Sequence, residues 1–564
     1  MTTALSPAAR DAALDALETT PLDVLVVGGG VVGAGTALDA VTRGLSTGLV
    51  EQRDLASGTS SRSSKLIHGG LRYLEMLDFA LVHEALQERG LLTNTLAPHL
   101  VRPVAFLYPL THRGWERPYV GAGLLLYDAL AMAGPYGRGI PRHRHLSRRG
   151  IRKVAPGIKA GVLSGAIMYH DAQVDDARLV MTVARTAASY GAHIATRTQV
   201  TGFLRDGDRV VGATAKCLET GREIRIRARV VVNAAGVWTN DLQNLVGGRG
   251  SLNVQASKGI HLVVPRDRIQ SDTGLILRTE VSVLFVIPWD RHWVIGTTDT
   301  PWTLDKAHPA ASRTDIEYLL EHVNTMLERP LTHDDIEGVY AGLRPLASGK
   351  SEPTSRISRE HTVVTPVPGL VMIAGGKLTT YRVMGKDAID ATADVLGALP
   401  ESRTHRVPLA GADGYAARAG QVGVLAERTG FDPARLERLL HRYGGLVDEL
   451  LALVEERPDL GRPLTGADDY LRAEVSYAVS HEGARHLDDV LTRRTRISIE
   501  TFDRGTLCAR EAALLMAAEL GWDDARVDVE VDHYLRRVEA ERQSQRERTD
   551  READEARVQA PEIV

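Results

Sequence analysis

The sequence predicts an α/β fold with a strand–turn–helix–strand unit near its start, a strand-rich middle and an all-helical C-terminal domain. The first unit is indicated by an apolar run at 23–27, a glycine cluster, a helical pattern at 31–43 and a second apolar run at 47–51. Strand patterns then recur up to about residue 300. After Pro408 they nearly vanish, and Leu, Ala, Arg and Glu recur at helical spacing to about residue 540.

The length and composition are those of an ordinary soluble globular protein. At roughly 100–200 residues per domain, 564 residues suggest about three domains. A formal net charge of -4 lacks the basic signature of a nucleic-acid-binding protein. Cys217 and Cys508 are far apart, and no His/Cys cluster has metal-ligand spacing. We therefore expect a reducing compartment, no metal site and no nucleic-acid partner.

Further elements follow along the chain. Residues 1–21 form an extension without the pattern of a signal peptide. Asp206-Gly207 and Thr220-Gly221 predict hairpin turns between strands in residues 199–232. Helices are expected at 79–94, 119–133, 177–190, 315–328 and 377–396, and further strands at 193–197, 260–264, 283–289, 292–297 and 369–374. The helix at 119–133 contains Asp128 and is too short to span a bilayer, so any membrane contact would be peripheral.

The glycine cluster predicts a dinucleotide-binding turn. Residues 28–33 read GGGVVG, directly after a strand and at the start of a helix. Gly28 permits the tight turn, Gly30 lets the backbone approach a pyrophosphate, and Gly33 allows close packing of helix and strand. Glu51 ends the second strand, where an acidic side chain accepts a hydrogen bond from a ribose hydroxyl.

Three later segments favour FAD over NAD as the dinucleotide. Residues 58–65 (GTSSRSSK) are dense in hydroxyls and backbone donors that suit a second anion-binding surface. Residues 233–236 (NAAG) form a strand-to-turn segment of the kind by which two-domain flavoproteins return to the dinucleotide domain. Residues 375–380 (GGKLTT) form another glycine-rich helix start, whose N–H groups would stabilise negative charge on a reduced flavin.

Several longer motifs of the sequence resemble those of a known protein family. The run SSKLIHGGLRYLE at 63–75 is similar to the flavin-proximal signature of the FAD-dependent (aerobic, respiratory) glycerol-3-phosphate dehydrogenases. The resemblance continues in family order through VDDARL at 174–179, KGIH at 258–261, IPW at 287–289, GTTD at 296–299, GLRPL at 342–346 and GGKLTTYR at 375–382. It covers about residues 22–390, and residues 405–540 resemble the family's C-terminal cap more weakly.

The resemblance implies a glutathione-reductase-like FAD-binding Rossmann domain with an inserted antiparallel-sheet substrate domain and a C-terminal all-helical cap. The expected FAD-binding parts are about 22–100, 170–250 and 340–400, and the substrate-binding parts are about 101–169 and 251–339. The helical domain would span 401–540 and a charged, solvated tail 541–564. The implied reaction is hydride transfer from C2 of sn-glycerol 3-phosphate to N5 of FAD, with electrons passed to ubiquinone or menaquinone.

Substrate and cofactor contacts follow from the same motifs. A dianionic phosphate needs fixed cations, and the arginine fork binds phosphate through two hydrogen bonds. The resemblance implies that the substrate is bound by Arg72, Tyr73, Arg344, Arg359 and Lys377. Gly342 and Pro345 would hold Arg344 in an irregular turn. The expected FAD contacts are Gly28, Gly30, Gly33, Glu51, Thr59, Ser60, Ser61, Ser64, Lys65, Leu66, His68, Ala234, Gly236, Gly376, Lys377, Leu378 and Thr379.

The catalytic set is expected to be Arg344 with a histidine that removes the hydroxyl proton as hydride leaves. His68 lies where close flavin approach is expected, whereas His261 lies in an apolar strand, where a histidine is more often a core residue. The sequence leaves both open as the base. Adjacent Asp175 and Asp176 point apart, so we expect them to cap the following helix rather than to form a catalytic pair.

Alternative functions stay open at this stage. The nearest is a glycerol-3-phosphate oxidase that reduces oxygen to hydrogen peroxide. An oxidase of amino acids or 2-hydroxy acids would need cations for a carboxylate, and a non-catalytic FAD-binding scaffold would have lost the cationic set. We expect a cytoplasmic protein, peripherally bound to the inner face of the cytoplasmic membrane, and a homodimer is one further expectation. The basic run at 492–496 either contacts anionic lipid or pairs within the molecule.

Overall fold

A parallel sheet forms the centre of the first domain. The computed structural model describes residues 4–112, 114–136, 139–159, 161–247, 252–279, 283–348 and 361–560. The strand order is β17-β18-β10-β1-β2-β7, with β17 antiparallel to its neighbour. These strands are β1 (Leu22–Val27), β2 (Thr47–Val50), β7 (His193–Ala195), β10 (Glu223–Asn233), β17 (His361–Val367) and β18 (Leu370–Gly375). The predicted strand–turn–helix–strand unit is confirmed as β1, α2 (Val31–Thr42) and β2.

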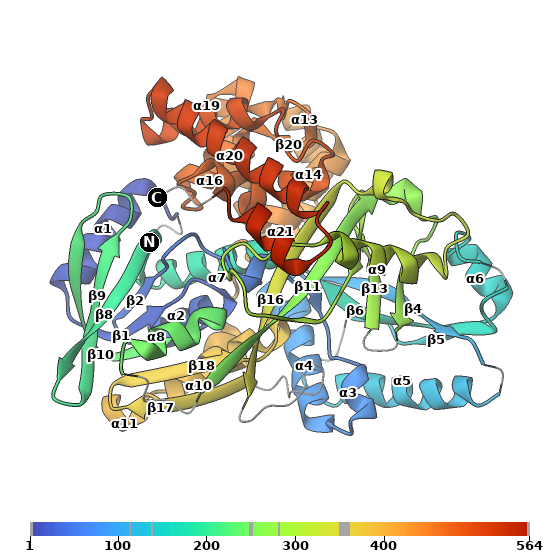
Figure 1. The fold of residues 1–564 in the computed structure, drawn as a ribbon, viewed down its shortest axis with the longest axis horizontal. Coiled ribbons are helices and arrows are strands. Elements are labelled where there is room, and N and C mark those ends of the chain that lie inside the picture. The colour runs from blue at the N-terminus through green and yellow to red at the C-terminus, as the bar shows by residue number, and fades with distance from the viewer. Residues whose placement is uncertain are drawn as a thin grey trace.

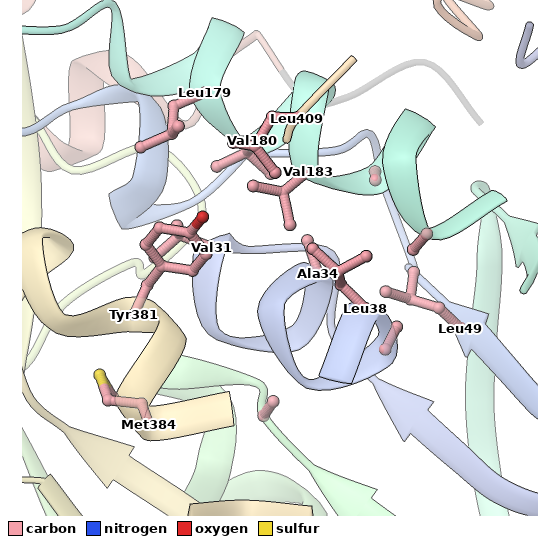
Figure 2. Close-up of a cluster of buried hydrophobic side chains, with 14 of the residues drawn as sticks. Val31, Ala34, Leu38, Leu49, Leu179, Val180, Val183, Tyr381, Met384 and Leu409 are labelled. Carbon is pink, nitrogen blue, oxygen red and sulfur yellow. The ribbon is translucent and has the colours of Figure 1, made fainter. Parts of the chain in front are cut away.

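Helix α2 is buried between two other helices. Figure 2 shows Val31, Ala34 and Leu38 of α2 facing side chains of α7 (Asp176–Ser189) and α10 (Tyr381–Asp390). Gly35 permits the contact with α10, because a Cβ there would lie 2.8 Å from the Tyr381 ring. This packing holds the N-terminus of α2 rigidly beside the glycine turn.

The N-terminal extension is part of the fold. It forms α1 (Pro7–Thr19), whose Ser6 side chain accepts a hydrogen bond from the N–H of Ala9. Leu14 and Leu17 are buried against the sheet core. Nearby, β8 (Thr198–Asp206) and β9 (Arg209–Cys217) pair antiparallel with each other, and β9 pairs with β10, which confirms the two predicted hairpin turns.

A second, largely antiparallel sheet forms the middle of the molecule (Figure 1). In β11, Leu262 faces one core and Val263 faces the other, as expected for adjacent residues of a strand. One face is covered by α9 (Arg313–Asn324), and the other by α4 (Phe79–Leu91) and α5 (Glu116–Met132). The strands are β3 (Leu66–Ile67), β4 (Arg102–Leu110), β5 (Arg144–Leu146), β6 (Gly165–Gln173), β11 (Asn253–Pro265), β12 (Gly274–Arg278), β13 (Val283–Trp289), β14 (His292–Gly296), β15 (Thr300–Trp302) and β16 (Gly338–Ser348).

The helices after residue 410 form a C-terminal domain above the two sheets (Figure 1). The longer ones are α14 (Pro433–Tyr443), α15 (Val447–Glu456), α16 (Arg472–Ser480), α19 (Ala509–Leu520), α20 (Asp524–Ser544) and α21 (Asp550–Arg557). A small hairpin, β19 (Pro463–Leu464) with β20 (Ala467–Leu471), interrupts this helical domain. Among the described residues, no helix combines the length and the apolar character needed to cross a membrane.

The last helix corrects the expectation of a solvated tail. Helix α21 packs against the rest of the molecule, with Ala553 and Arg557 buried. Its Asp550 accepts a hydrogen bond from the buried Lys258 of β11 at 2.5 Å. The charged composition of this segment predicted a solvated tail. Ion pairs with buried partners instead allow the charged helix to pack against the rest of the molecule.

Buried ion pairs also join the C-terminal domain to the first domain. Arg493 and Arg494 both bind Asp54, and Arg496 binds Asp175 and Asp176. These three arginines are buried, so the basic run at 492–496 pairs within the molecule and is not a lipid contact. The capping role expected of Asp175 is confirmed, because its side chain accepts a hydrogen bond from the N–H of Arg178.

Candidate active site

Three glycines form the turn between β1 and α2. The fold requires glycine at two of these positions, Gly28 and Gly33, but leaves room for a side chain at the third, Gly30. Gly28 has φ +115°, and a Cβ there would lie 2.7 Å from the carbonyl oxygen of Ala234. A Cβ at Gly33 would lie 1.9 Å from the carbonyl oxygen of Gly28. At Gly30 a Cβ would meet only the Ser60 hydroxyl, at 3.2 Å. The absence of a side chain at Gly30 therefore leaves space for a ligand that approaches the start of α2.

Glu51 lies beside this turn at the end of β2. Its carboxylate accepts hydrogen bonds from the N–H of Gly29 at 2.6 Å and the N–H of Arg53 at 2.8 Å. Burial raises the pKa of Glu51. Two backbone donors hold the carboxylate in place, with lone pairs left for a ribose hydroxyl.

The loop at 59–64 connects the glycine turn to a second region. The Ser60 hydroxyl accepts a hydrogen bond from the N–H of Val31 at the start of α2, at 3.0 Å. The Thr59 hydroxyl donates to the carbonyl oxygen of Leu343 in β16, at 2.6 Å. Gly342 lets this loop approach β16, because a Cβ there would lie 2.5 Å from the carbonyl oxygen of Arg62.

A cleft that is partly open to solvent lies beyond this loop. It brings together many side chains that the sequence analysis singled out. The predicted residues that line it are Thr59, Ser64, Leu66, His68, His261, Arg344, Gly376, Lys377, Leu378 and Thr379.

Arg344 lies within strand β16 and not in the irregular turn expected from its motif. It pairs in register with Ser257 of β11. Its guanidinium donates to Asp299 Oδ1 at 3.2 Å and to the Thr297 hydroxyl at 3.1 Å. Pro345 is tolerated beside it because β16 is an edge strand that pairs with β11. These bonds orient the arginine, and its side chain stays 22% exposed toward the cleft.

Lys377 lies at another wall of the cleft, and it contacts Tyr73, which does not line the cleft itself. The Lys377 ammonium lies 3.8 Å from the centre of the Tyr73 ring. Gly375 and Gly376 both have φ +82°, which turns the chain out of β18 so that Lys377 reaches this position. Two cations, Arg344 and Lys377, thus line one cleft.

His261 is a buried neutral histidine at the base of the cleft. Its Nε2 lies 2.8 Å from the Ser64 hydroxyl, and its ring stacks on Tyr340 with centroids 4.7 Å apart. Burial and the neighbouring cations Arg344 and Lys65 hold its pKa well below the ordinary value. At neutral pH it therefore presents an unprotonated ring that can accept a proton.

His68 is held by its backbone. Its N–H donates to the Thr379 hydroxyl at 3.1 Å, and its carbonyl oxygen accepts from the same hydroxyl at 3.2 Å. This link joins the end of β3 to the turn that follows Lys377. The His68 side chain lines the same cleft as His261.

Two residues expected to contact the cofactor have side chains that do not line the cleft. The Lys65 side chain turns away from the cleft, because its φ of +57° directs it into a buried ion pair with Asp176 at 2.8 Å. The ring of Tyr340 lies 5.1 Å from the Lys65 ammonium. Ser61 is buried, and its carbonyl oxygen accepts a hydrogen bond from Arg496 at 3.3 Å. It lines a different cavity, described below.

The remaining predicted residues either do not line the cleft or lie outside the part of the chain that the structure describes. Ala234 is bonded through its N–H to the carbonyl oxygen of Val27 and closes the glycine turn, and Gly236 has φ +57°. The side chain of Arg72 is outside the described part of the structure, as is the whole of Arg359. Their expected contacts with substrate stay predictions.

Sequence reasoning missed the residues that hold the cationic and histidine side chains. Asp299 lies in the GTTD motif, but only the register of β11 with β14 and β16 brings it to Arg344. Tyr340 carries no sequence signal beyond an aromatic residue in a strand. Its hydroxyl donates to the carbonyl oxygen of Ser63 at 2.9 Å, which fixes the loop beside His261.

The residues fit a bound FAD. A bare glycine backbone, the start of α2 and the Ser60 hydroxyl suit a pyrophosphate, and Glu51 suits a ribose. The cleft adjoins this end, because Thr59 of the same loop lines it. The carboxyl ends of β1 and β2 meet at this point, as is usual for ligand sites in open α/β sheets.

Comparisons with known proteins agree with this geometry. The family model described as FAD dependent oxidoreductase matches residues 23–389, and the one described as the C-terminal domain of alpha-glycerophosphate oxidase matches residues 402–527. A Mycobacterium leprae protein named glycerol-3-phosphate dehydrogenase is 56% identical over 560 residues, which are 99% of this chain and 95% of that protein. The human mitochondrial glycerol-3-phosphate dehydrogenase is 36% identical, over 92% of this chain and 73% of its own length.

A solved structure is similar over nearly the whole chain. The glycerol-3-phosphate dehydrogenase of Bacillus halodurans, solved in complex with FAD, has a TM-score of 0.78 and 29% identity, covering 95% of this chain and 98% of its own. The Mycoplasma pneumoniae L-alpha-glycerophosphate oxidase shares the fold, with a TM-score of 0.52 and 19% identity. The cleft, the glycine turn and these relatives together show that the chain belongs to the FAD-dependent glycerol-3-phosphate dehydrogenase family.

Proposed function

We propose that this protein oxidises sn-glycerol 3-phosphate to dihydroxyacetone phosphate and passes the electrons to a membrane quinone. The observation that carries the proposal is the meeting of Arg344, Lys377 and neutral His261 in one cleft next to the dinucleotide turn. A phosphate group requires cations, and the oxidation of a secondary alcohol requires a proton acceptor. The 56% identity to a protein named glycerol-3-phosphate dehydrogenase supports the same substrate.

In this proposal the two cations position the substrate. Arg344 presents a fork already oriented by Asp299 and Thr297, so little side-chain freedom is lost when a phosphate binds. Lys377 adds a second positive charge beside Tyr73. Arg72 and Arg359 are proposed to complete the set, as the family resemblance implies. A phosphate held in this way fixes the distance from the reacting carbon to the proton acceptor.

His261 is proposed to take the proton of the C2 hydroxyl. FAD, when bound, supplies the acceptor for the hydride that leaves C2. The Ser64 hydroxyl and the Tyr340 ring fix the His261 ring, and its depressed pKa keeps it unprotonated before the substrate binds. The phosphate charge would offset the repulsion from Arg344 and thereby make His261 a stronger base when substrate is present.

A spectroscopic experiment tests the reaction. Anaerobic addition of glycerol 3-phosphate to the yellow holoenzyme should bleach the visible flavin absorbance, and reoxidation by a quinone analogue should restore it. Steady-state turnover with quinone analogues against oxygen decides between a dehydrogenase and an oxidase that forms hydrogen peroxide. Unchanged absorbance after substrate addition would contradict the proposed reaction.

An exposed apolar edge supports a quinone acceptor. It comprises Trp115, Tyr119, Leu125 and Met132 on or beside α5, together with Met76 and Leu77 before α4 and Phe79 at its start. Trp115 is 61% exposed, Leu125 64% and Leu77 72%. The basic helix α6 (Arg148–Val154) follows in the chain. Exposed aromatic and apolar side chains suit binding at the surface of a bilayer. We propose that this edge binds the membrane peripherally.

We expect the double variant Leu77→Glu/Leu125→Glu to bind vesicles at least about tenfold more weakly, because burying each leucine contributes about 1.5–3 kcal/mol. Cosedimentation with vesicles that contain anionic lipid measures the binding. FAD content and activity with a soluble electron acceptor should not change. Val424→Glu, at a residue 65% exposed on the C-terminal domain, is the matched control and should bind normally. Equal binding by all three proteins would exclude the apolar edge.

Replacing Gly30 by valine should give a folded protein without FAD. A Cβ at Gly30 meets only the Ser60 hydroxyl within the chain, so the loss would come from the space taken from the pyrophosphate. Gly33→Ala is the contrasting variant. Its Cβ would collide with the backbone of Gly28, so it should lower the melting temperature as well. Flavin absorbance and thermal unfolding measure the two effects, and full FAD occupancy in Gly30→Val would contradict the assignment.

A further inference from the structure

A second cavity lies where the C-terminal domain meets the two sheets. It is partly open to solvent and is separate from the cleft described above. Residues from η10 (Val490–Arg494), α20 and α21 form one side, and β16 with the segment 308–311 forms the other. The charged and titratable groups that line it are Arg62, His308, Tyr340, Arg493, Arg496, Arg537, Glu541 and Arg557.

Helix α21 contributes Arg557 to the lining of this cavity and is firmly anchored. Asp550 at its start accepts a hydrogen bond from Lys258, and Asp554 accepts one from the N–H of Asp305 at 3.3 Å. The chain before α21 is tied by a hydrogen bond from the N–H of Arg313 to the carbonyl oxygen of Glu547 at 2.7 Å. The walls are therefore held in place without a ligand.

Two of the lining arginines are matched by acidic partners outside the cavity. Arg493 binds Asp54, Asp488 and Asp489, and Arg496 binds Asp175 and Asp176. These pairs join the domains, as does the pair between Arg178 and Glu482. They explain the presence of Arg493 and Arg496 without any ligand.

Arg62 and Arg557 are not matched in this way, and Arg537 shares both of its carboxylate partners with other arginines. Arg537 and Arg557 share Glu541, the one carboxylate among the described residues that line the cavity. Arg537 also reaches Asp488, which already binds Arg493. For Arg62, the described residues provide a hydrogen bond to the carbonyl oxygen of Ala307 at 3.1 Å and no carboxylate partner.

The hydrogen bonds of Arg557 also indicate a missing acceptor in this cavity. Its side chain is 4% exposed. Its Nη2 contacts His308 Nδ1 at 3.2 Å and Glu541 at 3.4 Å. Within the described part of the chain its Nη1 is buried and makes no hydrogen bond. A buried guanidinium nitrogen normally has an acceptor, so this donor indicates a missing one.

The ionisation of Arg62 and His308 shows the same excess of positive charge. Burial and the neighbouring Arg537, Arg557 and Arg493 lower the pKa of Arg62 to about 9. Burial and the neighbouring Arg557 and Arg62 keep the pKa of His308 far below its ordinary value. An anion in the cavity would relieve both effects.

We propose that this cavity is a second anion site, which binds a small tetrahedral oxyanion of the phosphate class. Arginine forks bind such oxyanions through paired, charge-assisted hydrogen bonds, and Arg62, Arg537 and Arg557 supply them from three different segments. Arg62 lines both this cavity and the catalytic cleft, and Tyr340 joins the cavity to His261 by ring stacking. The occupied site would thus bridge the C-terminal domain and the catalytic loop.

Calorimetric titration of the FAD-loaded full-length protein with inorganic phosphate tests the site. All titrations use an Arg344→Ala background at constant ionic strength, so that phosphate binding in the catalytic cleft is weakened and a failure of the proposed reaction does not affect the result. Phosphate should bind, and the additional change Arg557→Gln should weaken it at least tenfold. Arg551→Gln is the matched control on the same helix, because the Arg551 side chain is 82% exposed, and it should leave the affinity unchanged.

A crystallographic measurement on the unmodified protein covers the case in which Arg557→Gln does not fold. Crystals of the holoenzyme soaked in selenate should show anomalous density between Arg62, Arg537 and Arg557. Selenate density confined to the catalytic cleft would overturn the proposal. So would the absence of phosphate binding in the Arg344→Ala background, or an affinity that Arg557→Gln leaves unchanged.

Discussion

Replacing Arg344 by alanine should lower kcat/KM for glycerol 3-phosphate by at least about 100-fold, because charge-assisted hydrogen bonds of about 1.5–3 kcal/mol each are lost together with the position of the substrate. The slow oxidation of free glycerol should fall far less, since glycerol has no phosphate to lose. Steady-state kinetics with both substrates measures the difference. FAD content should be unchanged, because Arg344 binds Asp299 and Thr297 and is assigned to the substrate.

Two controls distinguish a loss of substrate binding from a loss of structural stability. Arg344→Lys keeps the charge but loses the fork, so it should recover part of the activity. Removal of Arg344 leaves Asp299 without that partner, so the melting temperature of each variant must be compared with that of the parent. Equal losses for glycerol and glycerol 3-phosphate would assign Arg344 to the flavin or to the fold.

The second large effect is expected at His261. His261→Gln should lower kcat by about 10²–10⁴-fold, the usual contribution of a general base, with FAD still bound. His68→Gln should lower kcat much less and act mainly through KM, since we place His68 at the cleft wall. Rapid anaerobic flavin reduction under single-turnover conditions separates the chemical step from reoxidation.

The pH dependence of flavin reduction adds an independent readout. The pKa of His261 is lowered by burial, Arg344 and Lys65, so its unprotonated, active form persists as the pH falls. Activity should therefore be kept down to the ordinary histidine pKa of about 6.5 and be lost only below it. In His261→Gln this acidic limb should disappear. If His68→Gln abolishes flavin reduction while His261→Gln retains most of it, His68 is the base instead.

Local sequence patterns were sufficient for the dinucleotide turn. Gly28 and Gly33 are dictated by contacts within a few residues of β1 and α2 or by the adjacent strand end, and such constraints leave a spacing that can be read directly. The same holds for the hairpin turn at Asp206-Gly207, where turn chemistry and strand alternation agree. The resemblance to a family added the substrate and the residues of the cleft.

Side-chain direction depended on strand register and could not be read from the motifs. Lys65 and Arg344 both lie in family motifs, yet Lys65 turns into a buried ion pair with Asp176, whereas Arg344 faces the cleft. Arg344 was expected in a turn, and only its pairing with β11 shows that it lies in a strand beside Asp299. A motif identifies the residue at a position. The direction of its side chain is set by a partner in a distant segment, which the motif does not contain.

Short-range chemistry in the chain thus determines the fold class, the cofactor turn and the types of group available to bind a phosphate. Tertiary structure alone decides which charges are paired. The sequence left the basic run at 492–496 open to a lipid contact or to pairing within the molecule, and α21 was expected to be a solvated tail. Both are buried against acidic or basic partners hundreds of residues away. The energy of a charge depends on its burial and its nearest opposite charge, and neither is a property of local sequence.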